Sequence, residues 1–266
     1  MLVHQCTLDP EVNETSGLLY LDGKFWTFND SGGEAALYCM DEDGRLLHKL
    51  VVENASNVDW EDVAGDSLWV YVADVGNNFA SRDTLSIYRI PLEALRSSVG
   101  NSGVSYTTHE GIIELSYSEK PEQTSRGWSS LDCEALLSWG DSLYLFSKNW
   151  VDQSTSVFVL PKDPGHYWLS SCTTYPARLL VTGADLDPVN NKVSLVGYRQ
   201  YMPVVLSYGF SASPAVLDCG GRARIYPLRV GRQVEGICYD TKGKLYISSE
   251  RSLKKQSLFR LGTSLH

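Results

Sequence analysis

Polar side chains, many of them acidic, recur at two fixed places in a repeated pattern of short apolar segments. One set stands where an apolar segment begins, and its members are Ser16, Glu61, Glu134, Thr182 and Glu235. The other set stands where the following segment ends, and its members are Asp30, Asp74, Lys148, Tyr198 and Glu250. Carboxylates that are brought together raise one another's pKa unless a cation compensates them. Hard cations such as Ca²⁺ take about six to eight oxygen ligands, which such a group can supply.

The apolar segments that carry these residues form five hairpins. Each hairpin joins a short strand to a more aromatic strand through a turn that contains Gly, Asn or Asp, the residues that tolerate a positive φ. The hairpins span residues 16–30, 61–74, 134–148, 182–198 and 235–250. A third strand is expected at 36–40, 85–90, 156–160, 204–208 and 258–261. A fourth strand follows in the first four repeats, for example at 46–52 and 111–117.

Four strands per repeat predict an all-β fold, a β-propeller of five four-stranded blades in a single domain, 1–266. The fifth repeat lacks its own fourth strand, so we expect the N-terminal strand, 2–8, to complete that blade and close the ring. The gap between the second and third repeats has room for a sixth blade. We see only two loops there, around 96–103 and 121–130, and one short helical stretch at 91–96.

The first strand of each blade lines the central channel of a propeller, so both sets of polar residues are expected around one mouth of the channel. The favoured hypothesis is a site for a divalent cation, with calcium preferred, or for a small polar ligand. The expected inner ligands are Glu61, Glu134 and Glu235. The expected outer ligands are Asp30, Asp74 and Glu250. Further acidic residues lie close to the first set, namely Asp59, Asp62, Asp132 and Asp185.

A structural alternative explains the same residues without a ligand. Glutamates at the start of inner strands can accept hydrogen bonds from backbone N–H groups of the next blade and so hold the ring together. Aspartates at strand ends can cap the turns that follow.

Two further functions remain open at this stage. One is a calcium-dependent hydrolase of an ester, lactone or phosphoester, in which the same acids hold the metal. The other is a protein-interaction platform that uses aromatic residues of the long loops. These residues are Trp128, Trp150, Tyr167 and Trp168.

Composition narrows the class of partner. The formal net charge of −9 argues against nucleic acid, because phosphate contacts need clustered Lys and Arg. No apolar run reaches the roughly 18 residues of a membrane-spanning helix. The six cysteines show no metal-binding spacing, and both buried thiols and one or two disulfides fit the pattern. The N-terminus lacks a signal peptide, which leaves a cytoplasmic protein or a mature exported chain.

Seven segments, taken in order, resemble a known group of proteins. They are 14–18, 29–33, 58–64, 74–78, 132–136, 182–185 and 234–237. Together they resemble a family of bacterial β-propeller proteins, mostly exported, that is loosely related to TolB-like and phytase-like-esterase propellers. The resemblance implies the fold and an exported or periplasmic location, and it implies no reaction. Related propellers such as regucalcin-like lactonases and paraoxonases bind calcium in the channel, although no residue of those enzymes maps cleanly onto this chain.

Overall fold

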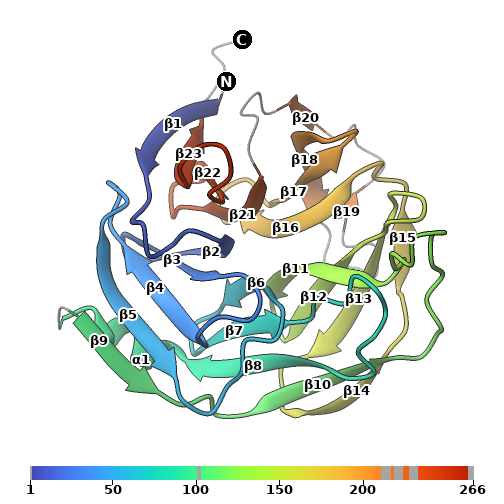
Figure 1. The fold of residues 1–266 in the computed structure, drawn as a ribbon, viewed down its shortest axis with the longest axis horizontal. Coiled ribbons are helices and arrows are strands. Elements are labelled where there is room, and N and C mark those ends of the chain that lie inside the picture. Colours follow the sequence, from blue (N-terminus) through green and yellow to red (C-terminus); the bar gives the residue numbers. More distant parts are fainter. Residues whose placement is uncertain (1, 101–102, 211–216, 219–223, 228–232, 263–266) are drawn as a thin grey trace.

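The computed structural model describes residues 2–100, 103–210, 217–218, 224–227 and 233–262. They form five β-sheets arranged around a common centre (Figure 1). The prediction of an all-β propeller with five blades is therefore confirmed, and the described residues contain no sixth sheet.

The blades follow one another along the chain. Blade 1 contains β2 (Thr15–Leu21), β3 (Lys24–Asn29), β4 (Ala36–Met40), β5 (Leu46–Val52) and β9 (Gly103–Thr107). Blade 2 contains β6 (Trp60–Gly65), β7 (Trp69–Asp74), β8 (Leu85–Pro91), β10 (Ile112–Tyr117) and β14 (Gly165–Leu169). Blade 3 contains β11 (Asp132–Trp139), β12 (Ser142–Lys148), β13 (Thr155–Pro161) and β15 (Thr173–Tyr175).

The last two blades complete the ring. Blade 4 contains β16 (Leu180–Asp187), β17 (Lys192–Arg199), β18 (Met202–Phe210), β19 (Leu217–Asp218) and β20 (Arg224–Pro227). Blade 5 contains β21 (Val234–Tyr239), β22 (Leu245–Ser249), β23 (Ser257–Leu261) and β1 (Leu2–Thr7). The innermost strands β2, β6, β11, β16 and β21 contact one another in that order, and β21 contacts β2 again (Figure 1).

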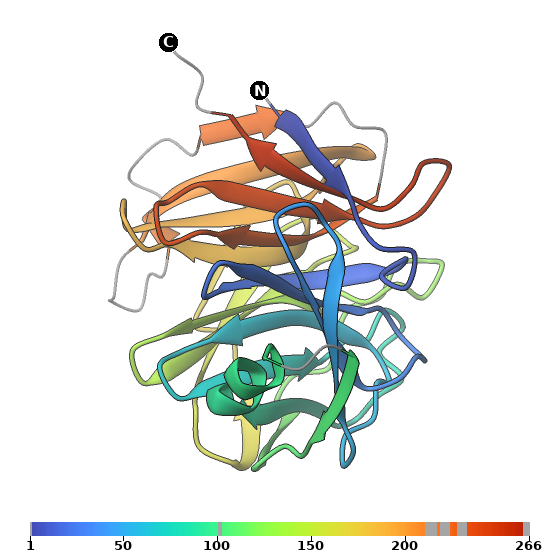
Figure 2. The ribbon, with the colours of Figure 1, turned by 90° about the vertical axis from the view of Figure 1, so that its left-hand side faces the viewer.

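Closure of the ring by the N-terminal strand is confirmed. β1 pairs antiparallel with β23, from Leu2 opposite Leu261 to Thr7 opposite Ser257. The two strands lie side by side in both views (Figures 1 and 2). This pairing satisfies the backbone groups that an unpaired strand edge would expose.

Three blades contain five strands instead of the expected four. In blade 4 the extra strand adds no width, because β19 and β20 both pair with β18, whereas blades 1 and 2 are wider. β9 pairs in parallel with β5 of blade 1, and β14 pairs in parallel with β10 of blade 2. Each of these strands comes from a later part of the chain and covers the outer edge of a preceding blade. The expected loop at 96–103 was therefore wrong at both ends, because helix α1 (Leu92–Ser98) runs past residue 96 and β9 begins at Gly103. The helix lies outside the sheets (Figure 2).

The hydrophobic core lies between neighbouring blades. Between blades 1 and 2, Trp26, Phe28 and Trp60 are fully buried. The rings of Phe28 and Trp60 meet edge to face at 5.4 Å, an arrangement that aromatic pairs prefer. Burial of one such side chain is worth about 1.5–3 kcal/mol, so each interface contributes substantially to the ring.

The structure also bears on membrane insertion and on the state of the cysteines. None of the described helices has the length and apolar character that crossing a bilayer requires. The five described cysteines have no disulfide bond. Cys219 lies outside the described residues.

Candidate functional site

A β-bulge near the start of the innermost strand recurs in every blade. The bulges lie between Ser16 and Leu19, Trp60 and Asp62, Cys133 and Ala135, Val181 and Gly183, and Val234 and Ile237. A bulge interrupts the alternation of side chains between the two faces of a strand and re-aims them. Glu61, Glu134, Thr182 and Glu235 all occupy bulged positions, and at the first of them the successor, Asp62, also bonds to other blades.

Three carboxylates converge where blades 1 and 2 meet at the channel mouth. Asp30 follows β3 of blade 1, while Asp59 and Glu61 stand at the start of β6 in blade 2. One oxygen from each carboxylate lies within 4.8 Å of the other two. Gly76 makes this approach possible, because a Cβ at that position would overlap the carboxylates of both Asp59 and Glu61.

One part of the triad of Asp30, Asp59 and Glu61 is held in place by a fourth carboxylate. Asp74 fixes the backbone at Asp59. Asp74 accepts hydrogen bonds from the backbone N–H groups of Val58 at 3.3 Å and Asp59 at 3.1 Å. Arg82 donates to Asp74 Oδ1 at 2.7 Å and to the Gly76 carbonyl at 2.9 Å. Asp74 is thus engaged with Arg82 and with backbone donors.

Burial raises the pKa of all three triad residues, and repulsion within the triad adds to the shift at Asp59 and Glu61. Burial is the largest cause in each case. The pKa of Asp59 is raised to about 6, with Asp30 and Asp132 adding to the effect of burial. The pKa of Glu61 lies well above its usual value, with Glu134 as the strongest charged neighbour. Such a site favours a bound cation, because the cation replaces the proton that the buried carboxylate would otherwise hold.

Lys148 is the last residue of β12 in blade 3, and the charges of Glu134, Glu235, Asp132 and Glu61 act on it. Its Nζ atom lies 2.7 Å from Glu134 Oε1; Glu134 is buried and Lys148 is partly buried. Burial raises the pKa of Glu235 to about 7, although Lys148 opposes the shift. Burial, followed by the charges of Glu235 and Asp30, raises the pKa of Glu250 to about 8. The mouth therefore contains a carboxylate triad and a lysine–carboxyl cluster, and the charges of the two groups act on each other.

Polar contacts between the blades are made mainly by aspartates and hydroxyl groups. Asp62 accepts backbone N–H groups of Leu136 in blade 3 at 2.9 Å and of Ala184 in blade 4 at 3.3 Å. Asp185 accepts the N–H of Tyr239 in blade 5 at 2.7 Å. Asp62 and Asp185 therefore link different blades, the role that the sequence analysis gave as the alternative to ligand binding. No described residue donates a backbone hydrogen bond to the carboxylate of Glu61 or Glu134.

The predicted ligand residues divide into three groups. Asp30 and Glu61 come together with Asp59, which the sequence placed only near the first set. Glu134, Glu235 and Glu250 surround Lys148, and Asp74 binds Arg82. The ion pair between Lys148 and Glu134 could have been predicted, because Lys148 is the one lysine among the residues at the ends of the second strands. Arg82 lies in a loop between two strands, and no sequence pattern singled it out.

A large cavity adjoins the lysine side of the mouth. It has a volume of about 1130 Å³ and lies between blades 3, 4 and 5. Lys148 and Glu235 form its boundary with the channel mouth, and Trp150, Tyr198 and Tyr201 contribute aromatic side chains.

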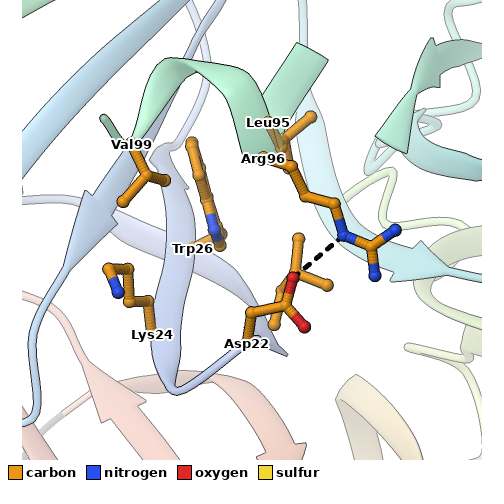
Figure 3. Close-up of a pocket in the computed structure, with 7 residues that line it drawn as sticks. Asp22, Lys24, Trp26, Leu95, Arg96 and Val99 are labelled. Atoms are coloured by element: carbon orange, nitrogen blue, oxygen red, sulfur yellow. Dashed lines mark hydrogen bonds and ion pairs between the residues drawn. The ribbon is translucent and has the colours of Figure 1, made fainter. Parts of the chain in front are cut away.

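A smaller cavity of about 300 Å³ lies beneath α1, at the opposite end of blade 1 from Asp30. Figure 3 shows Trp26 between Lys24 and the ion pair of Asp22 with Arg96. The Nε atom of Arg96 lies 2.9 Å from Oδ2 of Asp22. The cavity is separate from the acidic mouth.

The loop aromatics that suggested a protein platform occupy two places. Trp128 stacks on Trp150 with ring centres 4.4 Å apart, and Trp150 borders the large cavity. Tyr167 and Trp168 lie on β14, the outermost strand of blade 2, where Trp168 is exposed. Their use in binding a protein stays a prediction.

Comparisons with known proteins agree with the architecture. No protein-family model and no curated protein matches the chain. The PQQ-bound aldose sugar dehydrogenase from Streptomyces coelicolor is similar in structure, with 12% identity, a TM-score of 0.54, and coverage of 98% of this chain and 97% of that one.

Other similar structures include a calcium-binding protein, regucalcin, from Agrobacterium tumefaciens, with 13% identity, a TM-score of 0.48, and coverage of 96% of this chain and 92% of that one. A putative TolB from the same organism has 12% identity, a TM-score of 0.44, and coverage of 89% of this chain and 70% of that one. At these identities the likeness shows the fold alone. The chain is a β-propeller, and TolB and regucalcin propellers are among its structural neighbours. Export stays a prediction.

Proposed function

We propose that this propeller binds a divalent cation, with calcium as the best fit, at the channel mouth through Asp30, Asp59 and Glu61. The observation that carries the proposal is the convergence of three carboxylate oxygens within 4.8 Å of one another. Glu61 gives independent support. The residue is only 7% exposed, no described residue bonds to its carboxylate, and its oxygens are not among the fully enclosed atoms. The carboxylate is therefore partly desolvated and open to the channel, and a bound cation would offset that desolvation.

None of the described lysines and arginines forms an ion pair with the triad. Lys148 is bonded to Glu134 and Arg82 to Asp74, so each acts on the triad only from a distance. The triad therefore has no cationic partner of its own. Its oxygens suit a hard cation, and the triad contains none of the His or Cys ligands that zinc prefers. Calcium accepts an irregular shell that water completes, whereas magnesium demands a near-ideal octahedron.

This proposal changes the roles expected for the other residues. Glu134 and Glu235 were expected as inner ligands, but Lys148 lies among them and takes one as its partner. We assign them, with Glu250, to the surrounding charge. Asp74 positions the backbone at Asp59 and keeps the role of an outer, orienting group.

Thermal unfolding tests the proposal, with EDTA, Ca²⁺, Mg²⁺ or Mn²⁺ added to wild type, Glu61→Gln and Glu134→Gln. A cation at 100 times its Kd stabilises the folded state by about 2.7 kcal/mol. For a chain of this size we expect Tm to rise by roughly 5–10 °C with Ca²⁺. Glu61→Gln should abolish the rise. Glu134→Gln, the matched control, should keep most of it because its carboxyl group is not a ligand.

The absence of a shift with every cation would refute the proposal. An equal loss of the shift in both variants would refute the assignment of the triad, and would return the site to the ring of glutamates expected from the sequence.

The cavity beside the mouth supports a second candidate, a calcium-dependent hydrolase of an ester, lactone or phosphoester. A bound metal can lower the pKa of its water and supply the nucleophile at neutral pH. Turnover of nitrophenyl esters or phosphoesters that EDTA abolishes would distinguish this candidate from binding alone.

A further inference from the structure

The large cavity of about 1130 Å³ is built from loops of three blades. Gln153 follows β12 in blade 3, Gln200 and Tyr201 form the turn between β17 and β18 in blade 4, and Gln233 precedes β21 in blade 5. Leu253 lies in the loop after β22 and is fully exposed. The cavity thus depends on the ring being complete, because no single blade supplies its walls.

Backbone strain concentrates at this cavity. Seven described residues other than glycine have a positive φ, and three of them line it. They are Gln153 at 61°, Gln200 at 50° and Tyr201 at 64°. Residues with a Cβ adopt this conformation at a cost, and such costs gather where function requires a side chain in a particular place.

In the turn between β17 and β18, a different pair of residues would avoid the backbone strain. Arg199 pairs with Met202, so Gln200 and Tyr201 form a two-residue turn with φ positive at both positions. Asn-Gly and Asp-Gly are the pairs that favour such a turn. The chain uses Asp22-Gly23 for the same purpose in blade 1, with φ of 48° and 81°.

Packing does not explain the choice of Gln200 and Tyr201. Tyr201 is 97% exposed, so its ring gains little from contacts within the molecule. A strained turn that presents an amide and an exposed aromatic ring at the rim of a cavity indicates that both side chains contact a ligand.

The polar groups of the cavity define the chemistry of that ligand. Its three glutamines carry primary amides, which both donate and accept hydrogen bonds and therefore match hydroxyl groups. The only lysine among the described residues that line the cavity, Lys148, is already bonded to Glu134. Glu235 has a pKa of about 7, raised by burial, so its carboxyl group is partly neutral at neutral pH. A neutral ligand fits these conditions better than an ion.

We propose that the cavity binds a neutral carbohydrate, with Tyr201 stacking on the apolar face of a sugar ring and Gln153, Gln200 and Gln233 bonding to its hydroxyl groups. Aromatic side chains offer a flat apolar surface at little entropic cost. The volume exceeds the range of about 300–1000 Å³ typical of small-ligand sites, which suits two or three sugar units. The site stands apart from the cation triad, which lies between blades 1 and 2.

Isothermal titration calorimetry with defined oligosaccharides tests this proposal. The probes are maltotriose, cellotriose, xylotriose and N-acetylchitotriose, with tetramethylammonium and glucose 6-phosphate as charged comparators. The test variant is the double substitution Gln200→Asn, Tyr201→Gly, which installs the preferred turn pair. The control is Ala80→Gly, which relieves another positive φ, 52°, away from the cavity.

We expect at least one neutral oligosaccharide to bind with a Kd of about 1 mM or tighter. The double variant should bind it at least about tenfold more weakly while its Tm stays equal or rises, because the turn is relieved of strain. Ala80→Gly should bind like wild type. A variant that merely misfolds would show a lowered Tm, so the result separates a contact from a folding defect.

Three results would overturn the proposal. They are no binding of any neutral probe, binding of the charged probes alone, and unchanged affinity in the double variant. Repeating the titration in EDTA separates the two sites, since the cation proposal stands or fails on the thermal shift with Ca²⁺ whatever the sugar result.

Discussion

Removal of the Asp62 side chain should destabilise the ring more than removal of any single surface carboxylate. Asp62 is fully buried at the channel. Its carboxylate accepts three backbone N–H groups, from Val63 at 2.8 Å, Leu136 at 2.9 Å and Ala184 at 3.3 Å. These donors belong to blades 2, 3 and 4, so one side chain joins three blades.

The magnitude follows from the donors left behind. Each buried N–H group without an acceptor costs about 1–3 kcal/mol. Asp62→Ala leaves three such N–H groups without an acceptor. We reduce the expected loss of unfolding free energy to about 3–6 kcal/mol, because water can enter the space and because the variant no longer buries a carboxyl group. At 2–4 °C per kcal/mol, Tm should fall by roughly 6–24 °C. Asp185→Ala leaves two donors, those of Leu186 and Tyr239, and should lose about 2–4 kcal/mol.

Urea unfolding followed by circular dichroism measures both values, with calorimetry as a check on Tm. Asp41→Ala is the control. Asp41 accepts two N–H groups, from Asp43 and Arg45, but does so in an exposed turn where water can replace it. Asp41→Ala should lower the free energy of unfolding by less than about 1 kcal/mol. If Asp62→Ala unfolds no more easily than Asp41→Ala, the interpretation of the channel aspartates as links between blades is wrong.

Two further predictions concern the lysine side of the mouth. In EDTA, stability should be greatest at mildly acidic pH and should fall as the pH rises from about 5 to 8. The reason is that Glu235 and Glu250 have folded-state pKa values of about 7 and about 8 against an ordinary value of 4.5, so the folded state holds more protons across that range. Urea midpoints between pH 5 and 9 check this, and a flat or rising profile would contradict it. Lys148→Met should destabilise the protein by about 3–5 kcal/mol, because it leaves the Glu134 carboxylate buried without a partner. Adding Glu134→Gln should restore most of the loss in the same assay, and a double variant as unstable as the single one would show that the ion pair is not the cause.

Local sequence signals were sufficient for most of the fold. Turn pairs such as Asp22-Gly23, set between short apolar segments, marked the hairpins, and hairpins need only neighbouring residues to specify them. The missing fourth strand in the last repeat was sufficient to predict the pairing of β1 with β23. β9 and β14 were not predicted, because each pairs in parallel with a strand of a preceding blade, and a five-residue segment contains no information about so distant a partner.

The candidate site was predictable in position but not in detail. The repeat placed Glu61, Glu134 and Glu235 at equivalent points around the ring, and the bulges at these points support their placement at the channel mouth. The repeat could not show that Asp59 would turn toward Asp30, since that depends on the space left by Gly76. Nor could it show which glutamate would take Lys148 as its partner, because five blades offer several neighbours at similar distance.

The pairing of β1 with β23 also sets an order for biosynthesis. β1 leaves the ribosome before every other strand, and its partner leaves after all of them. Blades 1 to 4 can assemble on the nascent chain. The side of β2 that contacts β21 in the complete ring stays uncovered until β21 has been synthesised. During that interval the growing arc has two exposed ends, and long-range pairing of this kind is slow and prone to aggregation. The period before β21 and β23 have emerged is therefore the stage at which the growing arc is most open to aggregation.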